Sequence, residues 1–165
     1  LKRVKKLRVN MDRLNFSNEI KNYNALDISE KEKFDVIILD SPCSGVGTLR
    51  RNPDILFKKK PPNLKVLTKI QINLINKAAK LLNKNGVLLY MVCSFFYDET
   101  KAIKNKFLND NKNFSQYKFT IGSYKKFRKF LDNDGDIFCI PSKYENYMVD
   151  GFYGVKFINN GWFVI

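Results

Sequence analysis

Two cysteines stand at equivalent places in this chain, each shortly after an apolar run. Cys43 follows residues 36–39, Cys93 follows residues 87–92, and a stretch with helical periodicity lies between the two runs. A strand, a helix and a second strand form a βαβ unit, in which the two strands are parallel. Because the carboxyl ends of parallel strands lie at one edge of the sheet, we expect both thiols to face one cleft. Two thiols in one cleft favour covalent chemistry.

The elements that must position these thiols are predicted from hydrophobic periodicity. The spacing predicts a helix over residues 64–82, with Asn63 as its N-cap and Asn85-Gly86 as its stop. Residues 34–39 and 87–92 are predicted to be buried strands, and residues 41–62 a long functional loop. The other predicted elements are helices near 2–8 and over 98–108, a weak strand near 19–23, a turn over 132–135, and closing antiparallel strands over 137–140 and 152–158.

The composition excludes several kinds of site. The chain has no histidine, which excludes a Ser-His-Asp triad, a Cys-His hydrolase and a histidine metal site built from these residues alone. Its three cysteines include no CxxC pair, so they indicate neither a zinc site nor a disulfide framework. We therefore expect no metal and a reduced, intracellular compartment: the cytoplasm first, with the nucleolus and the organelles as alternatives.

The chain of 165 residues is long enough for one domain with a modest core. No stretch approaches the roughly 20 apolar residues of a membrane span, so we expect no membrane partner. The chain begins at Leu1 rather than Met, which indicates a piece of a longer protein.

The chain is strongly basic, with 30 Lys and Arg residues against 16 Asp and Glu and a formal charge of +14. A cationic excess of this size attracts polyanions, of which nucleic acid is the commonest. The alternative is that the abundance of Lys and Asn reflects a biased genome composition. Clustering favours the functional interpretation, because the basic residues gather over 2–8, 50–60 and 125–129, and the second group directly follows the Cys43 loop.

A glycine pair in the Cys43 loop suggests a nucleotide-binding site at first sight. Gly45 and Gly47 would begin a dinucleotide fingerprint, but the position of its third glycine is Arg50. The fingerprint is therefore rejected, and the loop is interpreted through Asp40, Pro42 and Cys43.

The residues around both cysteines match a pair of known motifs. The first strand ends in Asp40-Ser41-Pro42-Cys43-Ser44-Gly45, and the second ends in Tyr90-Met91-Val92-Cys93-Ser94. These segments resemble the Asp-Ala-Pro-Cys-Ser-Gly and Tyr-x-Thr-Cys-Ser motifs of the S-adenosylmethionine-dependent RNA cytosine-C5 methyltransferases, the Sun-like or Fmu-like proteins, especially their ribosomal RNA members. Residues 50–55, Glu99 and the run Asp150-Gly151-Phe152-Tyr153 are also similar to that family.

The resemblance implies an α/β, Rossmann-like class I methyltransferase fold with a mostly parallel sheet and an antiparallel final strand. It implies that residues 1–165 are a partial, N-terminally truncated catalytic domain, because the glycine-rich cofactor loop of the family precedes the region present here. S-adenosylmethionine is the implied cofactor. Its implied contacts are Asp40, Pro42 and Asn24, with Asp27 as a nearby acid that would substitute for Asn24 near the adenine.

The resemblance also assigns the chemistry. Carbon 5 of cytosine is a poor nucleophile until a thiolate adds at carbon 6; Cys93 is the implied nucleophile, Cys43 assists its release, and Asp40 is the third catalytic residue. A thiolate needs a lowered pKa, for which two arginines after the loop or a helix N-terminus would supply the positive field. The target base must be unstacked, so the implied partner is RNA, ribosomal RNA first. The implied RNA-binding residues are Arg50, Arg51, Lys58 and Lys59.

Two other functions stay open from the residues alone. One is a non-catalytic RNA-binding remnant of a methyltransferase fold, and the other is a thiol redox protein that uses Cys43 and Cys93. Cys139 is expected to be a small buried hydrophobe. The aromatic residues 95–97 are expected to pack in the core rather than to stack on a base.

Overall fold

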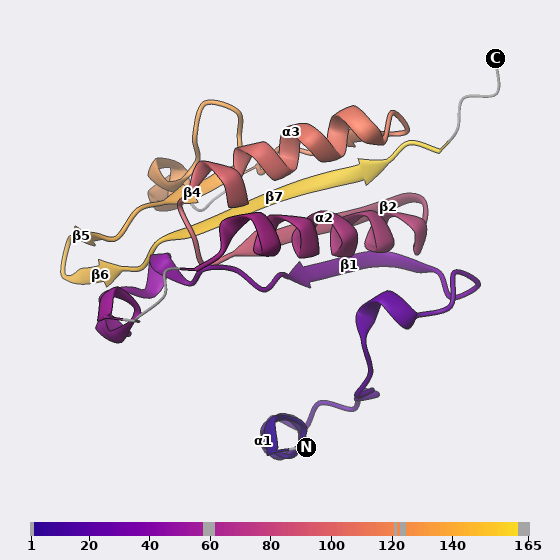
Figure 1. Ribbon diagram of the computed structural model, residues 1–165, viewed down its shortest axis with the longest axis horizontal. Coiled ribbons are helices and arrows are strands. Elements are labelled where there is room, and N and C mark those ends of the chain that lie inside the picture. The colour runs from indigo at the N-terminus through magenta and orange to yellow at the C-terminus, as the bar shows by residue number, and fades with distance from the viewer. Residues whose placement is uncertain (1, 58–61, 121, 123–124, 162–165) are drawn as a thin grey trace.

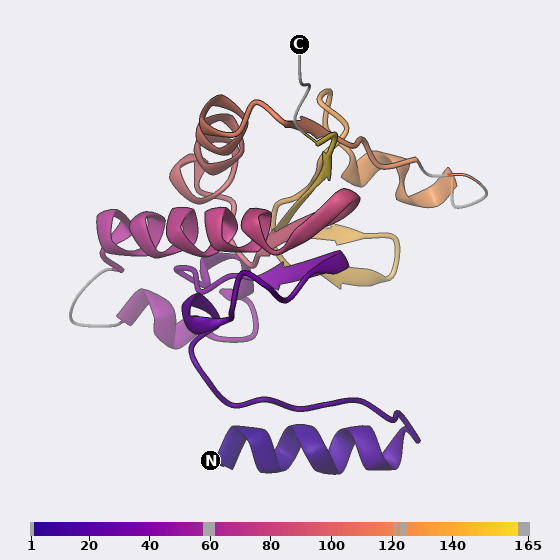
Figure 2. The same cartoon turned by 90° about the vertical axis from the view of Figure 1, so that its right-hand side faces the viewer.

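The protein is a sheet whose one face is covered by helices (Figure 1). The computed structural model describes residues 2–57, 62–120, 122 and 125–161. The sheet has five strands in the order β1-β2-β7-β3, with β4 also paired to β7. The strands are β1 (Phe34–Asp40), β2 (Leu82–Val92), β3 (Phe114–Gln116), β4 (Ile137–Cys139) and β7 (Phe152–Asn159). Helices α2 (Leu64–Lys80) and α3 (Lys101–Asp110) lie on the same face of this sheet, as Figure 2 shows.

The predicted βαβ unit is confirmed. β1 and β2 are parallel, with Ile37 opposite Leu88 and Asp40 opposite Met91, and α2 connects them. β7 runs antiparallel to β2, β3 and β4, which confirms the antiparallel final strand and the pairing of the two closing strands. The carboxyl ends of β1 and β2 therefore lie at one edge of the sheet, on the left in Figure 1.

The apolar stripe of α2 forms the core against β2. Ile75 is fully buried and packs in one cluster with Leu88 and Tyr90. Asn63 caps the helix as predicted, because its side-chain oxygen accepts a hydrogen bond from the N–H of Val66 at 3.2 Å. Burial of a side chain such as isoleucine or leucine contributes about 1.5–3 kcal/mol. This packing fixes α2 on the sheet and holds the two parallel strands side by side.

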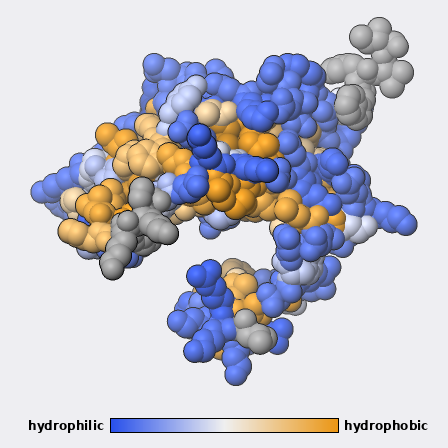
Figure 3. Space-filling model, in the orientation of Figure 1, coloured by the Kyte–Doolittle hydropathy of each residue, from blue (hydrophilic) through white to orange (hydrophobic). Residues whose placement is uncertain are grey.

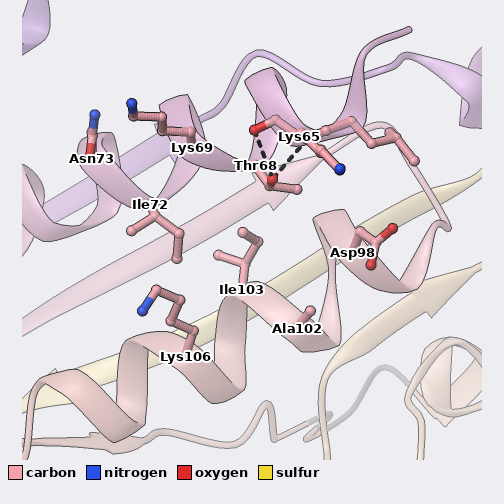
Figure 4. A pocket seen from close by; sticks show the side chains of 10 residues that line it. Lys65, Thr68, Lys69, Ile72, Asn73, Asp98, Ala102, Ile103 and Lys106 are labelled. Atoms are coloured by element: carbon pink, nitrogen blue, oxygen red, sulfur yellow. Dashed lines mark hydrogen bonds between the residues drawn. The ribbon is translucent and has the colours of Figure 1, made fainter. Parts of the chain in front are cut away.

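A groove of about 580 Å³ separates α2 from α3. Ile72 of α2 and Ile103 of α3 point toward each other in Figure 4, and Lys65, Lys69 and Lys106 stand around them. Among the described residues, none of the predicted site residues lines this groove. The groove results from helix packing and is separate from the cysteine loops.

β1 is less buried than predicted. Val36 is 62% exposed and Ile38 is 63% exposed, because β1 is the edge strand of the described sheet and alternate side chains point away from the core. Ile37 and Leu39 lie on the opposite face and pack against the core. Figure 3 shows apolar residues gathered on the body over α2 and β1. The apolar run predicted the strand correctly but not its burial.

The end of α2 also differs from the prediction. The helix ends at Lys80 and β2 begins at Leu82, so Asn85-Gly86 does not terminate the helix. Asn85 instead has a φ of 64° inside the strand, near the point where the β1–β2 register shifts. The prediction that this dipeptide stops the helix is therefore wrong, because the dipeptide lies in an irregular part of the strand.

Three other predicted segments are corrected by the structure. Residues 19–23 form no strand. The loop over 41–62 contains two short 3₁₀ helices, η2 (Val46–Thr48) and η3 (Pro53–Phe57). Helix α3 begins only at Lys101, since Tyr97–Glu99 forms a separate 3₁₀ helix, η4, that turns Glu99 inward.

The N-terminal segment stands apart from the sheet. α1 (Lys2–Arg13) extends past the predicted helix, none of its residues is buried, and it forms a separate lobe below the body in Figures 1 and 3. The remaining elements are η1 (Ala25–Asp27), η5 (Lys125–Phe130) and a hairpin of β5 (Ser142–Tyr144) and β6 (Tyr147–Val149). In the part of the chain that the structure describes, no helix is both long enough and apolar enough to cross a bilayer.

An ionic cluster joins α3 to the predicted turn over 132–135. Asp132, Asp134 and Asp136 each place one carboxylate oxygen within 4.8 Å of the others. The ammonium groups of Lys101 and Lys104 lie among them, each 2.8 Å from Oδ2 of the fully buried Asp136. Because two lysines offset most of the charge of three carboxylates, we interpret the cluster as a structural ion-pair network, of which only Lys104 and Asp136 are buried.

Candidate active site

The two predicted thiols meet at the carboxyl edge of β1 and β2. The Sγ atoms of Cys43 and Cys93 lie 3.2 Å apart, and both cysteines are half-buried. The strand pairing continues to this point, because the N–H of Ser41 donates to the carbonyl of Met91 at 3.0 Å. The expectation that both thiols come together at one edge of the sheet is confirmed, and the cleft that they would face stays a prediction.

The two glycines of the Cys43 loop have structural roles. Gly45 has a φ of 74°, a conformation that side chains disfavour. The N–H of Gly47 donates to the carbonyl of Cys93 at 3.0 Å, and the N–H of Gly151 donates to the carbonyl of Gly47 at 2.7 Å. A Cβ atom on Gly47 would lie 2.0 Å from the carbonyl oxygen of Gly151. Glycine is therefore required here by the close approach of three backbone segments.

Sequence reasoning missed the part that Glu99 plays in this site. It was expected at a helix start, but its carboxylate is fully buried and accepts hydrogen bonds from Ser44 and Ser94. These serines directly follow Cys43 and Cys93. The repeated Cys-Ser pair was the available signal, because two equivalent hydroxyls brought to one sheet edge can donate to one nearby acid.

The electrostatics of the sulfur pair differ from those of a free thiol. Burial, and then the hydrogen bond with Cys93, raise the pKa of the Cys43 thiol to about 12. At neutral pH Cys43 is therefore a neutral thiol, able to donate its S–H to the sulfur of Cys93. The geometry of the contact allows either sulfur to donate to the other.

We expect the alkylation of Cys43 by iodoacetamide to depend on pH in an unusual way. The thiolate is the reactive form, so its rate should rise with a midpoint near pH 12 in the folded chain and near pH 9 in urea. At pH 8 the folded chain should react at least about a hundredfold more slowly at this position. Peptide mass spectrometry after brief labelling measures each cysteine separately.

The raised pKa of Cys43 also predicts how the stability of the fold changes with pH. The unfolded chain loses the Cys43 proton first, so the free energy of unfolding should fall as the pH rises from about 9 to about 12. A Cys43→Ala chain is the matched control, since it lacks this contribution to the pH dependence. An alkylation midpoint near pH 9 in the folded chain would contradict the assignment of Cys43 as a neutral thiol.

The residues predicted to contact the cofactor are only partly brought together. Asp40 ends β1 with an exposed side chain, and the neighbouring Pro42 is also exposed. Asn24 uses its side-chain oxygen to accept a hydrogen bond from the N–H of Leu26 at 3.1 Å, which caps η1 against α2. Among the described residues, no hydrogen bond joins Asn24 to Asp40 or Pro42.

The predicted RNA-binding arginines share one carboxylate. Nη2 of Arg50 lies 3.2 Å from Oδ1 of Asp150, and Nε of Arg51 donates to Oδ2 of the same residue. Both arginines remain exposed to solvent. Because Asp150 offsets part of their charge, the positive charge that follows the loop is smaller than the sequence suggests. Lys58 and Lys59 lie outside the described residues.

Residues 95–97 do not pack in the core as expected: Phe95 and Phe96 are half-buried, and Tyr97, the first residue of η4, is 64% exposed. Phe96 lines an apolar hollow of about 500 Å³ with Val46 and Leu49, and its ring contacts Phe95 edge to face at 5.6 Å. Cys139 is buried on β4, as expected for a small hydrophobe.

Comparison with known proteins identifies the family to which the chain belongs. Residues 1–158 match the family model described as 16S rRNA methyltransferase RsmB/F. The chain belongs to this family. The resemblance seen in the two cysteine motifs is thereby confirmed, and the paired sulfurs lie within the matched region of an RsmB/F family member.

Curated relatives of this RsmB/F chain are longer than it is. The probable ribosomal RNA small subunit methyltransferase B of Bacillus subtilis is 32% identical over 125 residues, which cover 75% of this chain and 27% of that protein. The ribosomal RNA small subunit methyltransferase B of Shewanella oneidensis is 34% identical over 110 residues, covering 65% and 26%. The chain therefore spans about a quarter of the length of these relatives.

Solved structures confirm the fold of this RsmB/F chain. NSun6 from Pyrococcus horikoshii, solved with SFG, matches with a TM-score of 0.78 and 22% identity over 97% of this chain and 39% of that one. A methyltransferase homolog protein from the same organism matches with a TM-score of 0.66 and 22% identity, over 96% and 50%. The predicted Rossmann-like α/β class is therefore confirmed.

Proposed function

We propose that the protein containing this chain methylates carbon 5 of a cytosine in 16S ribosomal RNA, with S-adenosylmethionine as the methyl donor. The observation that carries the proposal is the 3.2 Å approach of the Cys43 and Cys93 sulfurs at the carboxyl edge of parallel strands. Open α/β folds bind their ligands at this edge. Membership of the RsmB/F family supports a methyltransferase that acts on ribosomal RNA.

In the proposed reaction, Cys93 acts as the nucleophile. Its thiolate adds to carbon 6 of the cytosine, which makes carbon 5 electron-rich enough to accept a methyl group. The assignment is supported by the raised pKa of the neighbouring Cys43 thiol, since a thiol that stays protonated at neutral pH is a poor nucleophile. After methylation, Cys43 first releases its own proton to water and then takes the carbon-5 proton. The electrons of that C–H bond re-form the double bond between carbons 5 and 6, and the bond between carbon 6 and the sulfur breaks, which releases Cys93 as a thiolate.

The described residues fit part of a cofactor site. S-adenosylmethionine, when bound, supplies an electrophilic methyl group. Asp40 and Pro42 are exposed beside the cysteine loop and are available to hold its methionine end. Asn24 fits less well, because its side-chain oxygen already caps η1. The likeness to a structure solved with SFG, an analogue of this cofactor, supports the choice of donor.

A surface of cations and aromatic rings is the proposed contact for RNA beyond the target base. Lys125, Lys126, Arg128 and Lys129 of η5 are exposed, and among the described residues no carboxylate pairs with them. Phe130 of η5 contacts Tyr144 of the β5–β6 hairpin at 5.7 Å, and Lys129 lies over both rings. Figures 1 and 2 place this segment beside the hairpin. Interleaved cations and rings suit single-stranded RNA.

Neutralising η5 should weaken RNA binding in a salt-dependent way. Replacing its four basic residues by Gln should lower the slope of log affinity against log salt by up to about 3, since each cation releases about 0.7 counterions from single-stranded RNA. The matched control replaces four other exposed lysines that, among the described residues, also have no carboxylate partner: Lys31, Lys65, Lys69 and Lys84. Fluorescence anisotropy with 16S rRNA fragments measures both. An equal loss in the two variants would contradict a role specific to η5.

The proposed function is tested directly by methyl transfer. The full-length protein is incubated with 16S ribosomal RNA and S-adenosylmethionine labelled in its methyl group, and the digested RNA is analysed for 5-methylcytidine. Label in 5-methylcytidine is the expected result. RNA binding without any methylated product would favour the non-catalytic alternative, and label in another base would contradict the proposed chemistry.

A further inference from the structure

A buried carboxylate links the two cysteine loops through hydrogen bonds. Glu99 is fully buried, and each of its oxygens accepts two hydrogen bonds. We propose that Glu99 is a positioning residue that holds Cys43 and Cys93 at the separation their chemistry needs. The catalytic use of this positioning rests on the proposed function, but the separation of the two thiols can be tested without RNA or cofactor.

The four donors come from both loops and from α2. Oε1 accepts the backbone N–H of Ser44 at 2.8 Å and Nε2 of Gln71 at 3.1 Å. Oε2 accepts the hydroxyl of Ser44 and the hydroxyl of Ser94, both at 2.6 Å. Since these serines directly follow the cysteines, each loop is anchored one residue from its sulfur.

Gln71 extends the same link into the helical layer. It is fully buried on α2, and its amide also donates to the carbonyl of Pro42 at 3.0 Å. The Cys43 loop is therefore held at Pro42 by the helix and at Ser44 by the carboxylate. A buried carboxylate is costly unless donors surround it. The full set of donors around Glu99 thus favours the one arrangement in which both loops converge.

Two substitutions of Glu99 distinguish a positioning role from a need for its negative charge. A glutamine at position 99 can keep its carbonyl oxygen toward the N–H of Ser44 and Nε2 of Gln71. Its amide group then faces the two serine hydroxyls, which can rotate to accept rather than donate. An alanine removes all four acceptor contacts. The positioning role therefore predicts that Glu99→Gln is tolerated and that Glu99→Ala is not.

The test measures how closely the fold holds the two thiols together. The 165-residue chain carrying Cys139→Ala is equilibrated with reduced and oxidised glutathione; each Cys43–Cys93 disulfide formed reduces one oxidised glutathione to two molecules of the thiol. Mass spectrometry of the quenched mixture then gives the effective concentration of the thiol pair. Glu99→Ala should lower it by at least about tenfold, because charge-assisted hydrogen bonds to both loops are lost. Glu99→Gln should change it by less than about threefold.

Asp98→Asn is the matched control, since it removes the neighbouring, exposed acid and should leave the value unchanged. Circular dichroism establishes that each variant is folded. An unchanged effective concentration in a folded Glu99→Ala chain would overturn the proposal. If that variant does not fold, the Ser44→Ala/Ser94→Ala double variant, which keeps two of the four donors, is measured instead, and an unchanged value again overturns it. A failure of methyl transfer in the full-length protein leaves this result intact.

Discussion

Replacing Cys93 by alanine is expected to lower methyl transfer by at least about a thousandfold. The reason is that carbon 5 of cytosine becomes nucleophilic only while a sulfur is bonded to carbon 6. The sulfur of Cys93 lies at the open edge of the sheet, 3.2 Å from Cys43, with no other thiol beside it among the described residues. The measurement is single-turnover incorporation of labelled methyl groups into 16S ribosomal RNA by the full-length protein.

The control for this prediction is Cys139→Ala. Cys139 is buried on β4, and its substitution should change the rate by less than about threefold. The unchanged protein, Cys93→Ala and Cys139→Ala should bind RNA with similar affinity, because neither substitution removes a positive charge. Substantial methyl transfer by Cys93→Ala would show that another residue is the nucleophile.

Replacing Cys43 by alanine is expected to have the opposite effect on the covalent intermediate. If Cys43 assists removal of the carbon-5 proton, its loss leaves Cys93 bonded to the methylated base. The protein–RNA adduct should accumulate at least about tenfold over the unchanged protein and survive denaturing electrophoresis. Labelled RNA or labelled methyl groups should migrate with the protein band.

The double variant Cys43→Ala/Cys93→Ala identifies the bond that is trapped. It should form no adduct, because the attacking sulfur is missing. Absence of an adduct in Cys43→Ala alone, while Cys93→Ala is inactive, would mean that another group removes the proton. If the unchanged protein transfers no methyl group but cycles its Cys43–Cys93 disulfide while reducing another thiol or disulfide substrate, the thiol redox alternative would be favoured instead.

The corrected features share a physical origin. Glu99 was expected at a helix start, where acids are common. Its carboxylate is instead buried, because it accepts hydrogen bonds from Ser44, 55 residues away in the chain. Arg51 belongs to a run of basic residues that was expected to be free for RNA, yet it pairs with Asp150, which lies 99 residues further along the chain. Local patterns carry no information about partners brought near by the fold. The exposure of Val36 likewise depends on its strand's place at the edge of the described sheet.

By itself, the sequence determined the two cysteine motifs, the parallel strands that precede them and the helix that joins them. These follow from local periodicity and from the geometry of a βαβ unit, in which both strand ends share one edge. Only the tertiary structure decided the 3.2 Å contact of the sulfurs, the neutral state of Cys43 and the burial of Glu99 between the loops. Those properties depend on burial and on hydrogen bonds between distant segments, which exist only once the segments have packed together.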